Sequence, residues 1–318
     1  MYYKIGKCLI LTLLLFLIAC SSNSNGVNYI NIGTASTGGA YYPIGIAISE
    51  IISKNLGINS SAQVTGGAVE NVTLVQNGEI DIAITQSPMA YAGFNGLSPY
   101  EQKNGNIAAL FNGLSKGVFH IVVSESSGIN SVDDLKGKKV VLGPSGGGAI
   151  NVITDILSVY GLKLEDLEAT YVSYSDGMSM LADNNVDAVI VQAASPAPAI
   201  KELAASGKKF KILSIESDKI SELLSKFNYL DVIKLPADMY GTDSEITTVY
   251  LTNMMIVRKD LAEDTVYRIT KAIFENIDKV KESHPAAKDI SLQNATVRLP
   301  IPLHPGAEKY FKEKGVLK

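Results

Sequence analysis

The sequence is poor in the residues that most often carry catalysis or bind metals. Its 318 residues include two cysteines, no tryptophan and three histidines, His120, His284 and His304. The histidines share no metal-ligand spacing, and no cysteine pair is available to bind zinc. The glycine run at 146–148 is not followed by Lys and then Ser or Thr, so it is not a P-loop. We therefore expect no metal and no cofactor.

Both cysteines lie within the first 20 residues, in a segment typical of a bacterial lipoprotein signal. Two lysines precede an apolar run at 9–18, which is too short to span a bilayer as a stable helix. The run ends in Leu-Ile-Ala-Cys20, and a cysteine directly after Leu-x-Ala is what lipoprotein signal peptidase recognises. We expect removal of residues 1–19, acylation of Cys20 and a flexible tether over 20–27. The alternative is an ordinary signal peptide with an incidental cysteine.

The same segment limits where the protein works. Its removal leaves one cysteine, which carries the lipid, so the mature chain forms no disulfide. Removal also takes the formal charge from −4 to about −6. No basic run suggests nucleic acid, and no second stretch is long and apolar enough to cross a membrane. We expect an extracytoplasmic monomer that is lipid-anchored to a bacterial membrane, on the periplasmic side or at the cell surface.

The rest of the chain carries one pattern twice. A short strand is followed by a glycine-rich turn and a helix, with Ser-Thr-Gly-Gly-Ala at 36–40 and Ser-Gly-Gly-Gly-Ala at 145–149. Each copy then has a strand of the form Asp-x-x-x-x-Gln, at 81–86 and 187–192. Corresponding turns are separated by 109 residues and corresponding strands by 106, so the two copies have nearly the same internal spacing. Two α/β lobes of similar build, with a ligand held between them, are the simplest interpretation.

Strand, turn and helix alternate along most of the chain, which favours parallel sheets covered by helices. The length also favours two domains. An apolar run at 118–124, after an expected turn at 113–117, and a β-rich run at 247–257 are predicted to cross between the lobes as a hinge. We expect the first lobe to comprise residues 28–118 and 246–318, and the second lobe residues 119–245.

The expected ligand site lies between these lobes. Ligands of open α/β sheets bind beyond the carboxyl ends of the strands, and turns at helix N-termini attract anions. The candidate residues are those of the turns and strand ends: Ser36, Thr37, Gly38, Gly39, Thr65, Gly66, Gly67, Gln86, Ser87, Ser145, Gly146, Gly147, Gly148 and Gln192, with the hydroxyls of Tyr41 and Tyr42.

These residues favour a small carboxylate as ligand, although the glycines alone could serve only to make tight turns. Glu70 fits the first turn of a helix, where a carboxylate complements the dipole, better than it fits a ligand ammonium. The sequence leaves open whether Glu70 or Arg258 contacts the ligand.

One motif points to a different class of protein. Gly-Pro-Ser-Gly-Gly at 143–147 fits G-x-S-x-G, with Ser145 between a strand and a helix as in a nucleophile elbow. A lipid-anchored serine hydrolase would also need an acid and a histidine, and His284 and His304 belong to the expected first lobe. A surface antigen with a non-functional cleft is the third alternative. We expect a binding protein and not an enzyme.

Several segments resemble the TAXI branch of the solute receptors of TRAP transporters. They are Gly-Thr-Ala-Ser-Thr-Gly-Gly-Ala-Tyr-Tyr-Pro at 33–43, Thr-Gly-Gly-Ala-Val-Glu-Asn at 65–71, the strand from 81 through Gln86 and Ser87 to 91, and Ile-Pro-Leu-His-Pro-Gly-Ala at 301–307. The resemblance covers the mature chain. It implies a type II periplasmic-binding-protein fold that closes on glutamate, a dicarboxylate or an oxoacid, and delivery to TRAP transporter membrane subunits. The turn at 145–149 departs from it, having fewer hydroxyl residues.

Overall fold

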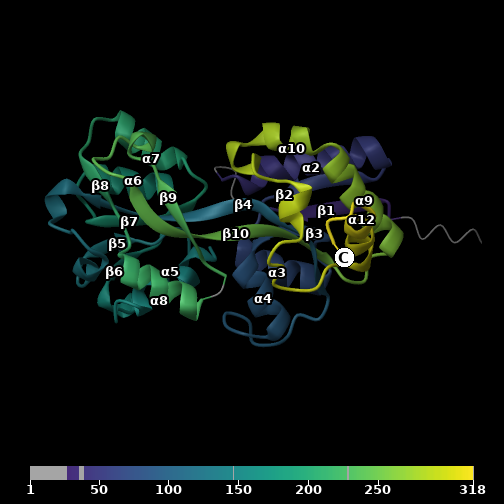
Figure 1. Cartoon of the computed structure of the whole chain (residues 1–318), viewed down its shortest axis with the longest axis horizontal. Helices are drawn as coiled ribbons and strands as arrows, with labels where there is room; N and C mark the ends of the chain where they lie inside the picture. The colour runs from purple at the N-terminus through teal and green to yellow at the C-terminus, as the bar shows by residue number, and fades with distance from the viewer. Residues whose placement is uncertain (1–26, 36–38, 146, 228, 318) are drawn as a thin grey trace, which may run out of the picture.

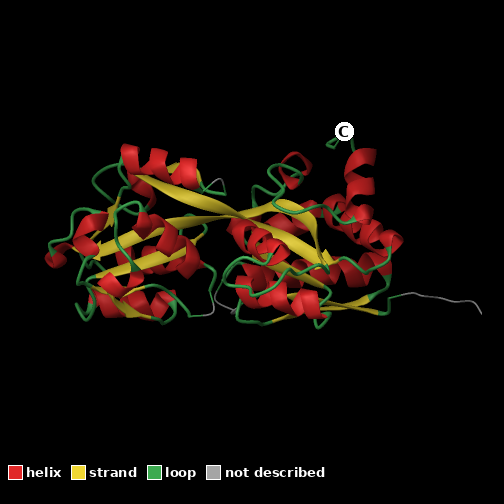
Figure 2. Ribbon diagram, turned by 90° about the horizontal axis from the view of Figure 1, so that it is seen from below, coloured by secondary structure: helices red, strands yellow, loops and turns green. Residues whose placement is uncertain are grey.

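The computed structural model describes residues 27–317 except 36–38, 146 and 228. Two α/β lobes lie side by side along the long axis, and two long neighbouring strands, β4 (Ile107–Ser124) and β10 (Ile246–Arg258), run from one lobe into the other (Figures 1 and 2). The strand order is β2-β1-β3-β10-β4-β7-β5-β6, with β8 beside β4 and β9 beside β10. Within the described residues, no helix is long and apolar enough to cross a membrane.

The first lobe is built on parallel pairing of β1 with β2 and β3, and β10 runs antiparallel to β3. Its strands are β1 (Tyr29–Gly33), β2 (Asn59–Gln63) and β3 (Ile82–Gln86), and its helices are α2 (Tyr41–Leu56), α3 (Ala68–Asn77), α4 (Ser87–Asn95), α9 (Glu263–Glu275), α10 (Ile277–Ser283), α11 (Leu292–Ala295) and α12 (Pro305–Glu313). Helices α2 and α3 end at the left-handed glycines Gly57 and Gly78, because glycine adopts a positive φ without strain.

The second lobe repeats this plan around β7, which pairs with β5 in parallel and with β4 antiparallel. Its strands are β5 (Lys139–Val141), β6 (Glu168–Thr170), β7 (Ala188–Ala193), β8 (Phe210–Leu213) and β9 (Asp231–Leu235), and its helices are α5 (Ala149–Ser158), α6 (Tyr174–Ala182), α7 (Pro198–Ala205) and α8 (Ser217–Lys226).

The turn predicted at 113–117 is wrong, because these residues lie inside β4. Gly113 has a left-handed φ of 70°, and the pairing of β4 with β10 shifts register around Asn253 and Met255. A glycine at an irregularity of this kind bends a strand without ending it. Gly113 therefore bends a continuous crossing strand, and Gly117 lies in its regularly paired part.

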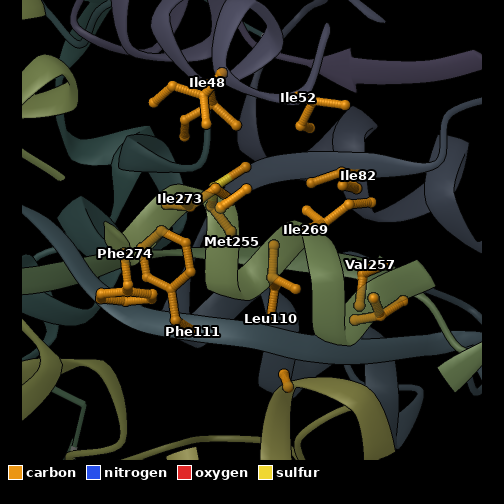
Figure 3. Close-up of a cluster of buried hydrophobic side chains, with 14 of the residues drawn as sticks. Ile48, Ile52, Ile82, Leu110, Phe111, Met255, Val257, Ile269, Ile273 and Phe274 are labelled. Atoms are coloured by element: carbon orange, nitrogen blue, oxygen red, sulfur yellow. The ribbon is translucent and has the colours of Figure 1, made fainter. Parts of the chain in front are cut away.

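Each lobe has its own hydrophobic core. In the first lobe, Ile48 and Ile52 of α2, Met255 of β10 and Ile273 of α9 pack into one buried cluster (Figure 3). The clusters of this lobe contain residues up to Leu114 and again from Met254 onward, whereas those of the other lobe run from Val118 to Leu251. The boundary between the two cores therefore lies within the two crossing strands, between Leu114 and Val118 in β4 and between Leu251 and Met254 in β10. The lobe limits drawn from the sequence stay a prediction.

The aspartates of the repeated Asp-x-x-x-x-Gln strands have matching roles. The Asp81 carboxylate accepts a hydrogen bond of 2.9 Å from the backbone N–H of Asn31 in β1. The Asp187 carboxylate accepts one of 2.9 Å from Lys139 in β5. Each aspartate thus ties its strand to the parallel neighbour, at the end of the strand away from the glutamine.

Candidate functional site

The two glutamines of the repeat meet between the lobes. Gln86 ends β3 and Gln192 lies near the end of β7, and Nε2 of Gln86 donates a 2.8 Å hydrogen bond to Oε1 of Gln192. Gln86 is only 5% exposed, and its Oε1 has no hydrogen-bond partner among the described residues. A buried carbonyl oxygen without a donor costs about 1–3 kcal/mol. A ligand N–H or O–H at this position would remove that cost.

Two glycines allow the glutamine side chains to approach. A Cβ at Gly148, the N-cap of α5, would lie 2.5 Å from Oε1 of Gln86. A Cβ at Gly117 of β4 would lie 2.5 Å from Nε2 of Gln192. The turn of the second lobe thus packs directly on the glutamine of the first lobe. At Gly148 the glycine serves this close approach, which goes beyond the making of a tight turn.

Tyr41 lies on the same interlobe surface. Its hydroxyl donates a 2.7 Å hydrogen bond to Oδ1 of Asn253, and the Asn253 amide donates one of 2.8 Å to Ser115. Burial and the nearby Tyr174 raise the pKa of Tyr41, and burial raises the pKa of Tyr174 to about 12. Both hydroxyls therefore keep their protons at neutral pH. Tyr42 is half-buried beside Tyr41 at the start of α2.

Ser87 opens α4 and faces both crossing strands. Its Oγ lies 3.1 Å from Oδ1 of Asn112 in β4 and 2.8 Å from Oγ1 of Thr252 in β10. Ser87 is 4% exposed. The hydroxyl thus anchors the start of α4 to the two crossing strands.

In the predicted turn at 65–67, backbone N–H groups are already hydrogen-bonded within the protein, one of them to the carboxylate of Glu70. The backbone N–H of Gly66 donates to Oε2 of Glu70, and Oγ1 of Thr65 lies 2.7 Å from Oδ1 of Asn71. The N–H of Gly67 has Oγ1 of Thr65 at 3.2 Å. Glu70 lies in the first turn of α3, which confirms that interpretation. Because these N–H groups already have acceptors, contact of this turn with a ligand stays a prediction.

The other candidate residues are less engaged with the cleft. Gly39 is exposed, and the N–H of Gly147 donates to the carbonyl of Pro144 at 3.0 Å. Arg258 pairs with Asp81 at 3.1 Å and with Asp260 at 2.9 Å, so it belongs to the end of β3 away from Gln86. The predictions for Ser36, Thr37, Gly38, Gly146 and Cys20 lie outside the described residues.

Ser145 is an exposed turn residue, and each histidine has hydrogen-bond partners elsewhere. His284 and His304 accept backbone N–H groups at the starts of helical turns. His120 is fully buried, with Nε2 at 3.1 Å from Ser195 Oγ and 3.0 Å from Tyr240 Oη. Within the described residues, Ser145 therefore has no histidine as base. Burial lowers the pKa of His120 to about 4, so it is neutral at pH 7.

A groove lies between the lobes on the side of α4, α5 and α8, and its volume is about 1710 Å³. We call it the interlobe groove. Arg298 and Asp231 form a 3.0 Å ion pair across it. The Asn151 amide lies 3.7 Å from the sulfur of Met89, again between the lobes. The lobes therefore already touch on the groove side as well as at the glutamine pair.

Comparison with known proteins places the chain in a family. A sequence model of the NMT1-like family matches residues 32–315. The chain belongs to the NMT1-like family. An aliphatic sulfonates-binding protein of Escherichia coli (strain K12) is 38% identical over 68 residues, which make up 21% of this chain and 21% of that protein. The chain thus matches about a fifth of this curated relative's length.

Solved structures share the fold. A Xanthomonas citri protein bound to ATP matches with a TM-score of 0.53 and 12% identity, over 91% of this chain and 97% of that one. A Bordetella bronchiseptica RB50 protein matches with a TM-score of 0.53 and 16% identity, over 92% and 90%. Together with the strand order, these matches confirm the type II periplasmic-binding-protein fold, in which two α/β lobes are joined by crossing strands.

Proposed function

We propose that this NMT1-like protein is an extracytoplasmic solute receptor that binds a small carboxylate between its lobes and delivers it to a TRAP-type secondary transporter. The observation that carries the proposal is the hydrogen bond between Gln86 and Gln192, which joins the two repeated strand ends. It lies beside a buried oxygen of Gln86 that has no donor among the described residues. A glutamate-like amino acid supplies N–H donors to such an oxygen. Dicarboxylates and oxoacids are candidates through the resemblance alone, because their ionised forms offer no donor to it.

A receptor of this kind works by closure. A ligand that contacts both lobes binds the closed arrangement more tightly, and only this difference in affinity shifts the population. The residues in position to contact it are Gln86, Gly148 and Gln192, with Tyr41 nearby. Acylated Cys20 and the polar tether would hold the receptor at the membrane beside its transporter.

Thermal unfolding of residues 21–318 with glutamate, succinate and 2-oxoglutarate tests the ligand class. A ligand at 100 times its Kd adds about 2.7 kcal/mol to the free energy of unfolding. Small-angle scattering should show a smaller radius of gyration with the ligand that stabilises the protein. No stabilisation by any of these three acids would rule out glutamate and acids of similar size as ligands.

The second candidate is a receptor for an organic sulfonate that serves an ABC importer. The 68-residue match to the sulfonates-binding protein favours it. Ethanesulfonate belongs in the same thermal screen for that reason. Uptake by reconstituted membrane subunits separates the partners, since collapse of the ion gradient stops a TRAP transporter and ATP removal stops an ABC importer.

A further inference from the structure

The interlobe groove has a polar floor and apolar walls. The crossing strands supply the floor, which includes Asn112, Ser115 and Thr252. Helix α4 and the segment after it supply one wall, and residues 224–227, 229 and 230 of the second lobe supply the other. A third apolar edge comes from the segment 297–300. A surface arranged in this way matches a molecule with a polar end and an apolar body.

Exposed apolar side chains gather at this groove. Among the described residues, eight large apolar side chains are exposed, and Tyr91, Leu97 and Val297 all line the groove. Their exposed fractions are 48%, 48% and 52%. Such clustering marks a binding surface more often than scattered exposure does.

The charges on the groove walls mostly have partners of opposite charge, apart from the Asp155 carboxylate, which accepts a hydrogen bond from the Tyr229 hydroxyl. Arg298 pairs with Asp231 at 3.0 Å, and Lys226 pairs with Glu222 at 2.7 Å. Lys116 is the exception at the floor, because its Nζ lies 3.9 Å from Asp289, at the outer limit for an ion pair. That ammonium also lies 5.1 Å from the centre of the Tyr250 ring. One weakly paired cation beside hydroxyls and amides suits one anionic group.

The groove has room for a ligand larger than succinate. The groove measures about 1710 Å³ although the lobes are already joined by the Gln86–Gln192 and Arg298–Asp231 contacts. Pockets for drug-sized ligands measure roughly 300–1,000 Å³. An acid the size of succinate would leave the apolar walls in contact with water.

We infer that the receptor takes an organic acid with an apolar or aromatic body, its acidic group near Lys116 and its body along Leu97, Phe227 and Val297. This inference rests on the proposed function and narrows its ligand class. Ser87 at the start of α4 also lines the groove and directly follows Gln86 in the chain, so the groove adjoins the glutamine pair without including it.

Calorimetric titration of the purified protein with matched acids tests the inference. 4-Phenylbutanoate is compared with butanoate, and octanesulfonate with ethanesulfonate, so that each pair shares its acidic group. Because burial of apolar area is favourable by about 25 cal/mol per Å², the longer acid of at least one pair should bind at least tenfold more tightly. Glutamate and succinate are titrated alongside.

Two variants locate the binding. Val297→Ser should weaken the binding of the longer acid about threefold or more and leave the short acid unchanged, since it removes only apolar contact. Val64→Ser is the matched control, because Val64 is similarly exposed, at 56%, and does not line the groove. It should change neither affinity.

The outcomes separate the two claims. Longer acids that bind no more tightly than short ones, while glutamate or succinate binds, would overturn the inference and leave the proposed function standing. Equal losses in Val297→Ser and Val64→Ser, or no loss in either, would mean that the longer acid binds elsewhere, and the inference would be wrong. If no acid of any length binds, the proposed function fails and the inference fails with it.

Discussion

Gly148→Ala should break the amide bridge between the lobes. The backbone at Gly148 has φ −65° and ψ −7°, which alanine adopts freely, so the new methyl group is the whole perturbation. It would lie 2.5 Å from Oε1 and 2.9 Å from Cδ of Gln86. The clash is with the end of a flexible side chain, so we expect Gln86 to rotate away and lose its hydrogen bond to Gln192.

The expected cost has two parts. Loss of one hydrogen bond destabilises the protein by about 1 kcal/mol. Replacement of a glycine N-cap by alanine adds about 0.5 kcal/mol. In a Gln86→Ala background the bridge is already gone, and only the second part remains. The predicted coupling between the two positions is therefore about 1 kcal/mol.

Urea unfolding of the wild type, both single variants and the double variant measures this coupling directly. Gly105→Ala is a suitable control, because a Cβ there has no heavy atom within 4 Å. If Gly148→Ala costs the same with and without the Gln86 side chain, the two residues are not coupled. The conclusion that the Gly148 turn packs on the Gln86 side chain and holds it in place would then be refuted.

Three further predictions follow from other parts of the molecule. His120 has a pKa of about 4 when folded and about 6.5 when unfolded, so the unfolded state binds more protons between these pH values. The free energy of unfolding should therefore fall as the pH drops from 6.5 to 4, and this residue contributes at most about 1.4 kcal/mol per pH unit. In urea unfolding measured across this pH range, His120→Gln should make the free energy of unfolding less dependent on pH. Asp81→Asn and Asp187→Asn should each cost about 1–2 kcal/mol in thermal unfolding, because each weakens a charge-assisted bond to a neighbouring strand and Asp81→Asn also weakens the ion pair with Arg258. A neutral result for either would remove its structural role. Cys20→Ser should move the protein from the detergent phase to the aqueous phase, and unchanged partitioning would exclude acylation at that residue.

The repeat was the most informative part of the sequence. It predicted that Gln86 and Gln192 lie at corresponding strand ends, and parallel strands within each lobe then bring those ends to the facing edges. Helix ends were equally predictable, since Gly57 and Gly78 adopt the left-handed conformation that ends α2 and α3. Both kinds of signal are local or periodic, so the sequence carries them directly.

What the sequence did not reveal depends on pairing between distant segments. Residues 113–117 have the composition of a turn, but pairing with β10 makes them part of β4. The contact of Glu70 with Gly66 depends on how a loop folds onto its own helix. The buried contacts of His120 join Ser195 and Tyr240, which lie 75 and 120 residues away. The interlobe groove likewise draws its walls from segments that no spacing rule connects.

The position of β10 also determines the order in which the lobes can be completed. This strand lies between β3 and β4 in the sheet, so the first lobe lacks its central strand until residues 246–258 have emerged from the ribosome or the translocation channel. Until then, β3 and the first half of β4 have unpaired edges, which are templates for aggregation. The first part of the chain to appear thus belongs to the lobe that is finished last.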